Sequence, residues 1–380
     1  MGIVKEKLPR ILFIMHMPPP VHGAAMVGKY IHDSKVINQS FDCHYLNLSA
    51  STNIAEVGVI GVKKIFFLIK IIYKIIKLII VLKPALCYYT PTSDGWGIYK
   101  DALVIQIIRL FKVKLLLHFH NKGVKNFSKH KIARFAYRII YKRLRIILLS
   151  EYIYEDVADY VRPDQVYYLN NGIPLIFSPV EYKEILQRRY SRQKNEILFL
   201  SNMISEKGIW TLLEACEILK KESIDFICNY VGNWGDITEE DFQREINRRN
   251  LQNNVFIRGP KYGNEKKSFF SDAQIFVFPT YYHGENFPLV LLEAMEYGLP
   301  CISTPEGGIQ SIIHHGKNGF IIPQKDANQL AKRIKELIQD PQKIKIMGEN
   351  SRQYFLSQFT IDYFENHLKE ILLDYLNTNN

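Results

Sequence analysis

One strand–loop–helix–strand unit in the second half of the chain constrains the fold most. The apolar run Ala273–Phe278 is typical of a buried parallel strand, and Cys301–Ser303 predicts the strand that follows. Between them, Pro288 suits the first turn of a helix, and Gly298 suits its end. Two strands joined through a helix run parallel, so this stretch predicts an α/β fold.

Two carboxylates stand around the loop of this unit. Glu285 comes just before the helix, and Glu293 lies eight positions later, inside it. A helix N-terminus at a strand end attracts phosphate through its free N–H groups and its macrodipole. A carboxylate there repels phosphate, unless it holds hydroxyl groups attached to that phosphate. Each glutamate alone is a common surface residue, but the pair favours a sugar phosphate or a sugar nucleotide as ligand.

Length and charge predict two domains with different partners. At 380 residues the chain exceeds one ordinary core, since a domain has about 150 residues. Residues 1–180 hold 25 Lys/Arg and 11 Asp/Glu, whereas residues 181–380 hold 24 and 27. No nucleic-acid recognition motif accompanies the basic half. An anionic membrane surface or a phosphorylated lipid is therefore favoured over nucleic acid as its partner.

An apolar stretch with recurring lysines, residues 51–84, is the most unusual part of the basic half. Lys63, Lys70, Lys74 and Lys77 fall on one helical stripe. Its uncharged runs are far shorter than the roughly 20 residues that span a bilayer. The stretch is therefore either a core helix with one solvated edge or a helix at a membrane interface. Residues 125–145 form a second basic, aromatic helical stretch.

The first half also contains candidate ligand residues at strand ends. Gly23 follows a predicted strand, residues 10–15, and permits close backbone approach at the start of a helix. Only Gly23 and Gly28 are present where a dinucleotide site needs G-x-G-x-x-G, so an NAD site is rejected. Further along, His120 follows the strand Lys114–His118, at the carboxyl end where α/β proteins bind ligands.

The second half opens with the strand Glu196–Leu200 and a loop that contains Asn202 and Lys207. A lysine in a strand-to-helix loop can neutralise a diphosphate. A later strand, Phe226–Val231, leads into a glycine-rich exit that begins at Gly232.

The segment GENFPLVLLEAMEYGLPCIST, residues 284–304, resembles the signature of the retaining GT-B glycosyltransferases of the glycosyl transferases group 1 family. That family has two glutamates separated by seven residues, as Glu285 and Glu293 are. Residues 201–208 resemble its Gly-Arg-x-x-x-Glu-Lys-Gly stretch, with Asn202 in place of the arginine. The resemblance covers residues 196–325 well and the first half loosely, which implies a shared donor and a divergent acceptor.

The resemblance implies a GT-B fold, in which two Rossmann-like domains enclose an interdomain cleft. The expected parts are an acceptor-binding domain over residues 1–175, a nucleotide-sugar-binding domain over 190–357, and a C-terminal helix over 358–380 that crosses back to the first domain. We place the hinge within residues 172–194.

The resemblance also assigns roles to the candidate site residues. It implies that Glu285 binds the hydroxyls of the donor sugar, that Glu293 binds the ribose, and that His120 contacts the donor sugar or the acceptor. Lys207 would stabilise the leaving diphosphate. The expected catalytic residues are thus His120, Glu285 and Lys207. The expected donor-binding residues are Gly23, Asn202, Lys207, Gly232, Glu285, Asn286, Phe287 and Glu293.

The implied reaction is retaining transfer of a hexose from a nucleoside diphosphate sugar to an acceptor hydroxyl, in bacterial surface glycan assembly. A UDP-sugar is favoured over a GDP-sugar as co-substrate, and the acceptor is a glycan or a lipid-linked intermediate. The chain contains no Asp-x-Asp, so we expect no metal and no further cofactor. A nucleotide-sugar epimerase of the same fold and a non-catalytic membrane-binding scaffold remain as alternatives.

The five cysteines have no paired spacing, which favours reduced thiols over disulfides or a zinc site. The N-terminus also lacks a secretory signal pattern. We therefore expect a cytoplasmic protein. If the lysine-rich stretch is an interfacial helix, the protein would bind peripherally to the inner face of the plasma membrane.

Overall fold

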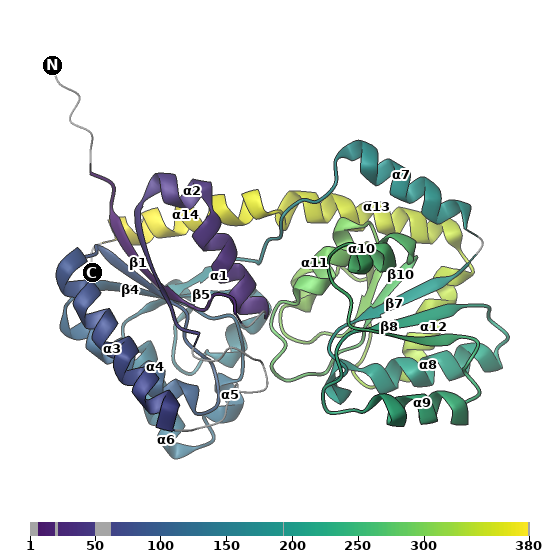
Figure 1. Cartoon of the computed structure of the whole chain (residues 1–380), viewed down its shortest axis with the longest axis horizontal. Helices are drawn as coiled ribbons and strands as arrows, with labels where there is room; N and C mark the ends of the chain where they lie inside the picture. The colour runs from purple at the N-terminus through teal and green to yellow at the C-terminus, as the bar shows by residue number, and fades with distance from the viewer. Residues whose placement is uncertain (1–6, 20–21, 50–61, 193, 379–380) are drawn as a thin grey trace. The chain divides into compact units, whose positions relative to one another are not determined.

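The computed structural model describes residues 7–19, 22–49, 62–192 and 194–378, with the backbone alone for residues 62–65. Residues 51–61 of the predicted lysine-rich stretch, and the side chain of Lys63, lie outside this description. The chain divides into a first unit, Met1–Gly172 with Ile361–Asn380, and a second unit, Ile173–Thr360. Figure 1 shows that each unit is a sheet covered by helices on both faces.

The first unit is built on six parallel strands in the order β2-β1-β3-β4-β5-β6. Parallel strands must be joined by crossovers, which is why helices alternate with them along the chain. The strands are β1 (Arg10–Met15), β2 (Asp42–Asn47), β3 (Leu86–Tyr89), β4 (Lys114–His118), β5 (Arg145–Leu148) and β6 (Val166–Tyr168).

Alternation along β1 shows how both faces of this sheet are buried. Leu12 and Ile14 belong to a core under α3, α4 and α6, whereas Phe13 and Met15 belong to a core under α1, α2 and α14. The helices of this unit are α1 (Gly23–Asp33), α2 (Lys35–Ser40), α3 (Val62–Leu82), α4 (Gly97–Leu110), α5 (Val124–Phe127), α6 (Lys131–Tyr141) and α14 (Ile361–Asn377).

The second unit has six parallel strands in the order β12-β11-β10-β7-β8-β9. They are β7 (Glu196–Leu200), β8 (Ile227–Val231), β9 (Val255–Gly259), β10 (Ile275–Phe278), β11 (Cys301–Ser303) and β12 (Gly319–Ile321). Its helices are α7 (Pro179–Ser191), α8 (Ile209–Lys221), α9 (Glu239–Arg248), α10 (Gly263–Asp272), α11 (Leu289–Glu296), α12 (Ala327–Ile338) and α13 (Pro341–Gln358).

The predicted α/β architecture is confirmed, and several boundaries differ from it. Pro288 is the N-cap of α11 rather than part of its first turn. The basic stretch 125–145 is not one helix, because α5 and α6 are separate and β5 already begins at Arg145. The first unit's N-terminal segment ends at Gly172, and the second unit begins at Ile173. Gly172 is the first residue of the range in which we expected the hinge.

The C-terminal helix α14 belongs to the first unit, as expected for a helix that crosses back. Phe364, Leu368 and Ile371 are buried with the core on one face of the first sheet. Among the described residues, no helix is both long enough and apolar enough to cross a membrane.

Candidate active site

The second sheet has a point where the chain changes its winding direction. β7 and β10 are neighbours in the sheet, although β8 and β9 come between them in the sequence. Open α/β sheets bind ligands at the carboxyl ends of the strands at such a point. The loop after β7 carries Lys207, and the loop after β10 carries Glu285. The fold therefore brings two sequence-predicted residues to one crevice.

Lys207 and Glu285 form an ion pair between these two loops. The Nζ atom of Lys207 lies 2.6 Å from Oε2 of Glu285, and the two side chains are only 14% and 10% exposed. The ammonium group also lies 4.3 Å from the ring centroid of Tyr282, a cation–π contact. A lysine ammonium has three N–H donors, so two remain for an anion.

A glycine allows the two loops to approach this closely. Gly208 follows Lys207 with a φ of +84°, and a Cβ at this position would overlap the carbonyl oxygen of Pro279. Any other residue would be strained at this φ and would push the loops apart. The ion pair thus depends on backbone contact as well as on charge.

The residues after Glu285 lead into α11. The carbonyl of Asn286 accepts a hydrogen bond from the amide of Gly308 at 2.6 Å. Asn286 is 4% exposed, and its side-chain Oδ1 has no hydrogen-bond partner in the described part of the chain. A buried acceptor without a partner is rare, and it is a candidate to receive a ligand hydroxyl. The Phe287 ring packs edge-on against Phe359, with centroids 5.9 Å apart.

Glu293 lies on α11 in a separate ion pair. Its Oε1 is 2.7 Å from Nζ of Lys266 on α10, and the side chains are 30% and 28% exposed. The carboxylate is therefore held in place while remaining accessible to solvent. Glu293 and Lys266 thus form one ion pair, and Lys207 and Glu285 form another.

The exits of β7 and β8 touch each other. Gly232 has a φ of +156°, and a Cβ on it would overlap the carbonyl oxygen of Ser201. The amide of Met203 donates to the carbonyl of Asn233 at 2.7 Å, which fixes the loop that contains Asn202. The Asn202 side chain itself is exposed.

Gly23 lies at the corresponding crevice of the first unit, next to the switch point between β1 and β3. It begins α1, and Nδ1 of His22 caps the helix by accepting from the amide of Ala25 at 3.3 Å. Among the described residues, and apart from its chain neighbours and the backbone of its own helix, no atom lies within 4 Å of where a Cβ on Gly23 would be. By contrast, a Cβ on Gly28 would overlap the carbonyl of His16.

His120 lies at the carboxyl end of β4 in a cluster of imidazoles. Its ring centroid is 4.1 Å from that of His118, whose Nδ1 bonds to the hydroxyl of Tyr88. Burial, with His16 and His22 adding to it, lowers the pKa of His120 to about 3. Nδ1 of His120 has no hydrogen-bond partner among the described residues. At neutral pH this imidazole is uncharged and can exchange hydrogen bonds with a ligand.

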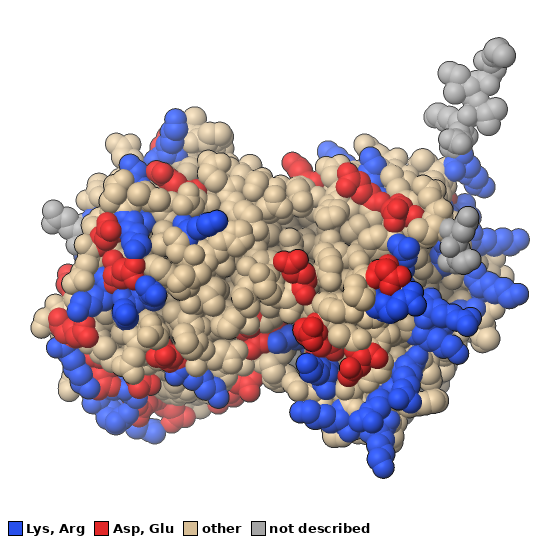
Figure 2. Space-filling view, turned by 180° about the vertical axis from the view of Figure 1, so that it is seen from behind, with Lys and Arg blue, Asp and Glu red and all other residues tan. Residues whose placement is uncertain are grey.

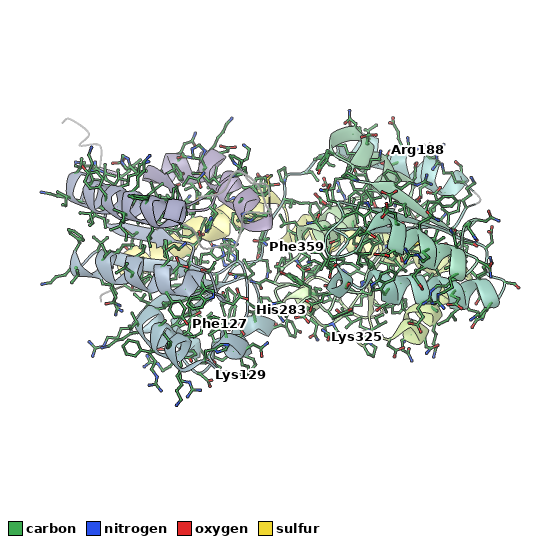
Figure 3. The ribbon with its side chains drawn as sticks, turned by 60° about the horizontal axis from the view of Figure 1, so that its bottom comes forward. Phe127, Lys129, Arg188, His283, Lys325 and Phe359 are labelled. Carbon is green, nitrogen blue, oxygen red and sulfur yellow. The ribbon has the colours of Figure 1, made fainter. Side chains whose placement is uncertain are left out.

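Sequence reasoning missed Tyr282 and Lys266, which contact the charged site residues. Tyr282 could have been noticed because it lies three residues before Glu285, but Lys266 is 27 positions from Glu293 and carries no local signal. Figure 3 labels two other residues of loops in the second unit, His283 and Lys325, and Nζ of Lys325 lies 4.4 Å from the ring centroid of Tyr281. Nδ1 of His283 lies 3.2 Å from Oε2 of Glu206, within hydrogen-bond distance.

The described residues contain no group of three His, Cys, Asp or Glu side chains that could hold a metal ion.

A cavity in the first unit lies elsewhere. It is lined in part by Arg143, Arg145 and Arg162, at the amino ends of β5 and β6. The candidate residues lie at the carboxyl ends of strands, so this cavity is not part of their site.

Two parallel Rossmann-like sheets with the C-terminal helix returned to the first unit define the GT-B class of folds. HepE of Anabaena, solved with UDP, superimposes with a TM-score of 0.73 at 16% identity over 96% of this chain and 100% of that one. The lipopolysaccharide outer core galactosyltransferase WaaB gives a TM-score of 0.72 at 16% identity over 96% and 99%.

Residues 183–354 match the model of the family "Glycosyl transferases group 1". This match covers most of the second unit. It is 30% identical over 145 residues to the putative colanic acid biosynthesis glycosyltransferase WcaL of Escherichia coli, 37% of this chain and 35% of that protein. It is 32% identical over 151 residues to the amylovoran biosynthesis glycosyltransferase AmsK of Erwinia amylovora, 39% and 37%. These matches span about a third of each relative.

Proposed function

We propose that the protein transfers a hexose from a UDP-sugar to a hydroxyl of a glycan acceptor, with retention of configuration. The observation that carries this proposal is the Lys207–Glu285 pair at the β7/β10 switch point. The pair sets a cation, which can bind phosphates, beside a carboxylate, which can accept hydrogen bonds from sugar hydroxyls. A nucleoside diphosphate sugar contains both kinds of group. Lys207 would hold the diphosphate with its two remaining donors, and Glu285 would accept bonds from the sugar hydroxyls.

The proposed step needs no redox partner. The bond from the anomeric carbon to the diphosphate oxygen breaks, and a bond from that carbon to the acceptor oxygen forms. The acceptor's proton passes to a phosphate oxygen of the leaving UDP. Negative charge grows on the diphosphate during the step, so Lys207 stabilises the transition state more than the bound donor. We assign no covalent nucleophile.

The other candidate residues would complete the donor site. The buried Oδ1 of Asn286, which has no hydrogen-bond partner among the described residues, could receive a sugar hydroxyl. The amides of Asn286 and Phe287 directly follow Glu285 in the chain. Glu293 would hold the ribose, and His120 would contact the donor sugar or the acceptor. In the second unit, Asn202 and Gly232 would be further donor-binding residues. We assign most of the donor binding to the second unit and acceptor binding to the first, with Gly23 as a donor-binding residue of the first unit.

The comparisons support the choice of substrates. HepE, which has the same fold, was solved with UDP, and WcaL and AmsK are described as enzymes of colanic acid and amylovoran biosynthesis. A polysaccharide intermediate carried on a lipid is the acceptor we assign. Because the chain has no Asp-x-Asp, we also propose that the diphosphate is stabilised without a metal.

A two-stage experiment tests this function. Thermal shifts with UDP-, GDP- and ADP-sugars would identify the donor, because a ligand that binds the native state raises its melting temperature. The chosen donor is then incubated with glycolipids extracted from bacterial membranes, and the anomeric configuration of the product is read by NMR. We expect UDP release that depends on acceptor, with the donor's configuration kept. Inversion, or conversion of the donor to its epimer without acceptor, would contradict the proposal.

A further inference from the structure

The solvent-facing side of α3 carries large apolar side chains as well as lysines. Its inner stripe, Ile71, Ile75 and Ile79, is buried in the core of the first unit. The opposite stripe is exposed and repeats at helical spacing. It consists of Phe66, Ile69, Lys70, Tyr73, Lys74, Lys77, Ile80 and Val81.

Two neighbouring helices extend this surface. α3, α4 and α6 cover the same core on one face of the first sheet, and Figure 1 shows them on one side of the unit. On α4, Leu103 and Leu110 are 48% and 80% exposed; on α6, Ile132 and Phe135 are 72% and 65% exposed. Lys131, Arg134 and Arg138 lie exposed among the α6 residues. We refer to these exposed residues of α3, α4 and α6 as the three-helix face.

The charge on this part of the chain is strongly one-sided. Residues 62–150 contain 19 Lys/Arg and only two acidic residues, Asp94 and Asp101. The Asp101 side chain is fully buried and bonds to the hydroxyl of Tyr89 and the amide of Thr92. Figure 2 shows Lys and Arg side chains gathered along the right-hand edge of the first unit. None of the ion pairs among the described residues involves Lys70, Lys74 or Lys77.

We propose that the three-helix face docks on an anionic lipid bilayer. Contiguous exposed apolar side chains indicate a membrane or protein contact, and scattered single ones do not. Here aromatic and aliphatic side chains alternate with unpaired lysines, so that apolar groups can enter the headgroup boundary while ammonium groups reach lipid phosphates. The charge complements anionic headgroups. Since no described helix can span the bilayer, the contact is peripheral.

Docking would bring the enzyme to a lipid-borne acceptor. Only this link to the acceptor rests on the proposed function. Binding to vesicles needs neither the donor nor catalysis, so it can be tested separately. Failure of one therefore leaves the other standing.

Flotation of the full chain with phosphatidylglycerol-containing and pure phosphatidylcholine vesicles, at low and high salt, tests the proposal. We expect binding to the anionic vesicles at low salt and release at high salt. The variant K70Q/K74Q/K77Q removes three exposed charges and should lower the partition coefficient roughly 100-fold. The matched control K317Q/K332Q/K345Q removes three exposed lysines of the second unit and should float like wild type.

A second variant tests the apolar contribution. I132S/F135S should reduce binding at least 10-fold, whereas I346S/L356S, which replaces exposed residues of α13, should not. Thermal melts of all variants check that they fold. Equal binding to neutral vesicles, no flotation at low salt, or unchanged binding of K70Q/K74Q/K77Q would overturn the proposal. Binding only to native membranes and not to pure lipid would indicate a protein partner instead, and would overturn it equally.

Discussion

The Nζ atom of Lys207 lies 2.6 Å from Oε2 of Glu285, and the two residues come from loops that follow neighbouring strands but lie 78 positions apart in the chain. Each side chain is largely buried, so the pair is poorly screened by solvent. A charge in such a place is costly unless it is used or compensated. The pair holds a cation ready at the strand ends without leaving it unpaired before a ligand arrives.

The first prediction concerns Lys207. Replacing it with Ala removes a charged contact to the diphosphate, and this contact strengthens as the diphosphate leaves. Its loss should raise the free energy of the transition state by on the order of 2–4 kcal/mol. We expect kcat/KM for the donor to fall roughly 30- to 1,000-fold. Lys221, in an exposed ion pair with Glu217, supplies the control K221A, which should keep wild-type kinetics. Wild-type turnover by K207A would remove Lys207 from the mechanism.

The second prediction concerns metal ions. Lys207 is assigned the role that a metal bound by Asp-x-Asp would play, and the chain has no Asp-x-Asp. Sugar transfer should therefore continue in EDTA at the rate measured without it. If chelation abolishes transfer and Mn²⁺ or Mg²⁺ restores it, the assignment of the diphosphate contact is wrong.

Much of the fold was readable from the sequence because it depends on local patterns. Unbroken apolar runs marked β7 and β10, and Gly298 marked the end of α11, where it adopts a φ of +63°. Chain order alone also placed Lys207 and Glu285 at carboxyl ends of strands. Their contact was not predictable, because it depends on the order of strands in the sheet.

Other features depend on packing between distant elements. Nothing near Glu293 indicates that Lys266 on another helix pairs with it. The residues around His120 also carry no local signal, because His16 and His22, which lower its pKa, follow a different strand. On α3, the sequence left a core helix and an interfacial helix open. The structure shows a buried stripe and an exposed apolar stripe on the same helix, which is compatible with both.

A third prediction concerns acid stability. The pKa of His120 is about 3 and that of His16 about 4, mainly through burial, against 6.5 for an exposed histidine. Below pH 6.5 the unfolded chain therefore binds protons that the folded chain does not. Stability should fall as the pH decreases from 6.5 towards 4, by up to about 1.4 kcal/mol per pH unit for each histidine.

Chemical denaturation at pH 7 and pH 5 checks this, with H120Q as the variant that cannot titrate. H120Q should lose less stability than wild type between the two pH values. Lys100 and Asp101, which act on His16 with opposite sign, are unchanged in this comparison. Equal losses would show that His120 is not shielded from protons in the folded state.

The fourth prediction concerns Glu296, whose Oε1 accepts from the amide of Ile176 at 2.6 Å. Burial raises its pKa to about 7, although the Ile176 bond and Arg352 oppose the shift. The folded state thus favours the protonated acid, and its contribution to stability is lost as the pH rises from 4.5 through 7. E296Q should be more stable than wild type at pH 8, by about 1–3 kcal/mol, with no such gain at pH 4.5. A gain independent of pH would contradict a titrating Glu296.

Equilibrium titration of UDP and of the UDP-sugar selected by thermal shift, into wild type and E285Q, tests the central claim most directly. If Glu285 holds the sugar hydroxyls and Lys207 the diphosphate, E285Q keeps the wild-type Kd for UDP or binds it more tightly. Its Kd for the UDP-sugar, relative to that for UDP, should rise about 10-fold or more, because charge-assisted hydrogen bonds are lost. An unchanged ratio of the two Kd values, or loss of UDP binding alone, would contradict the account.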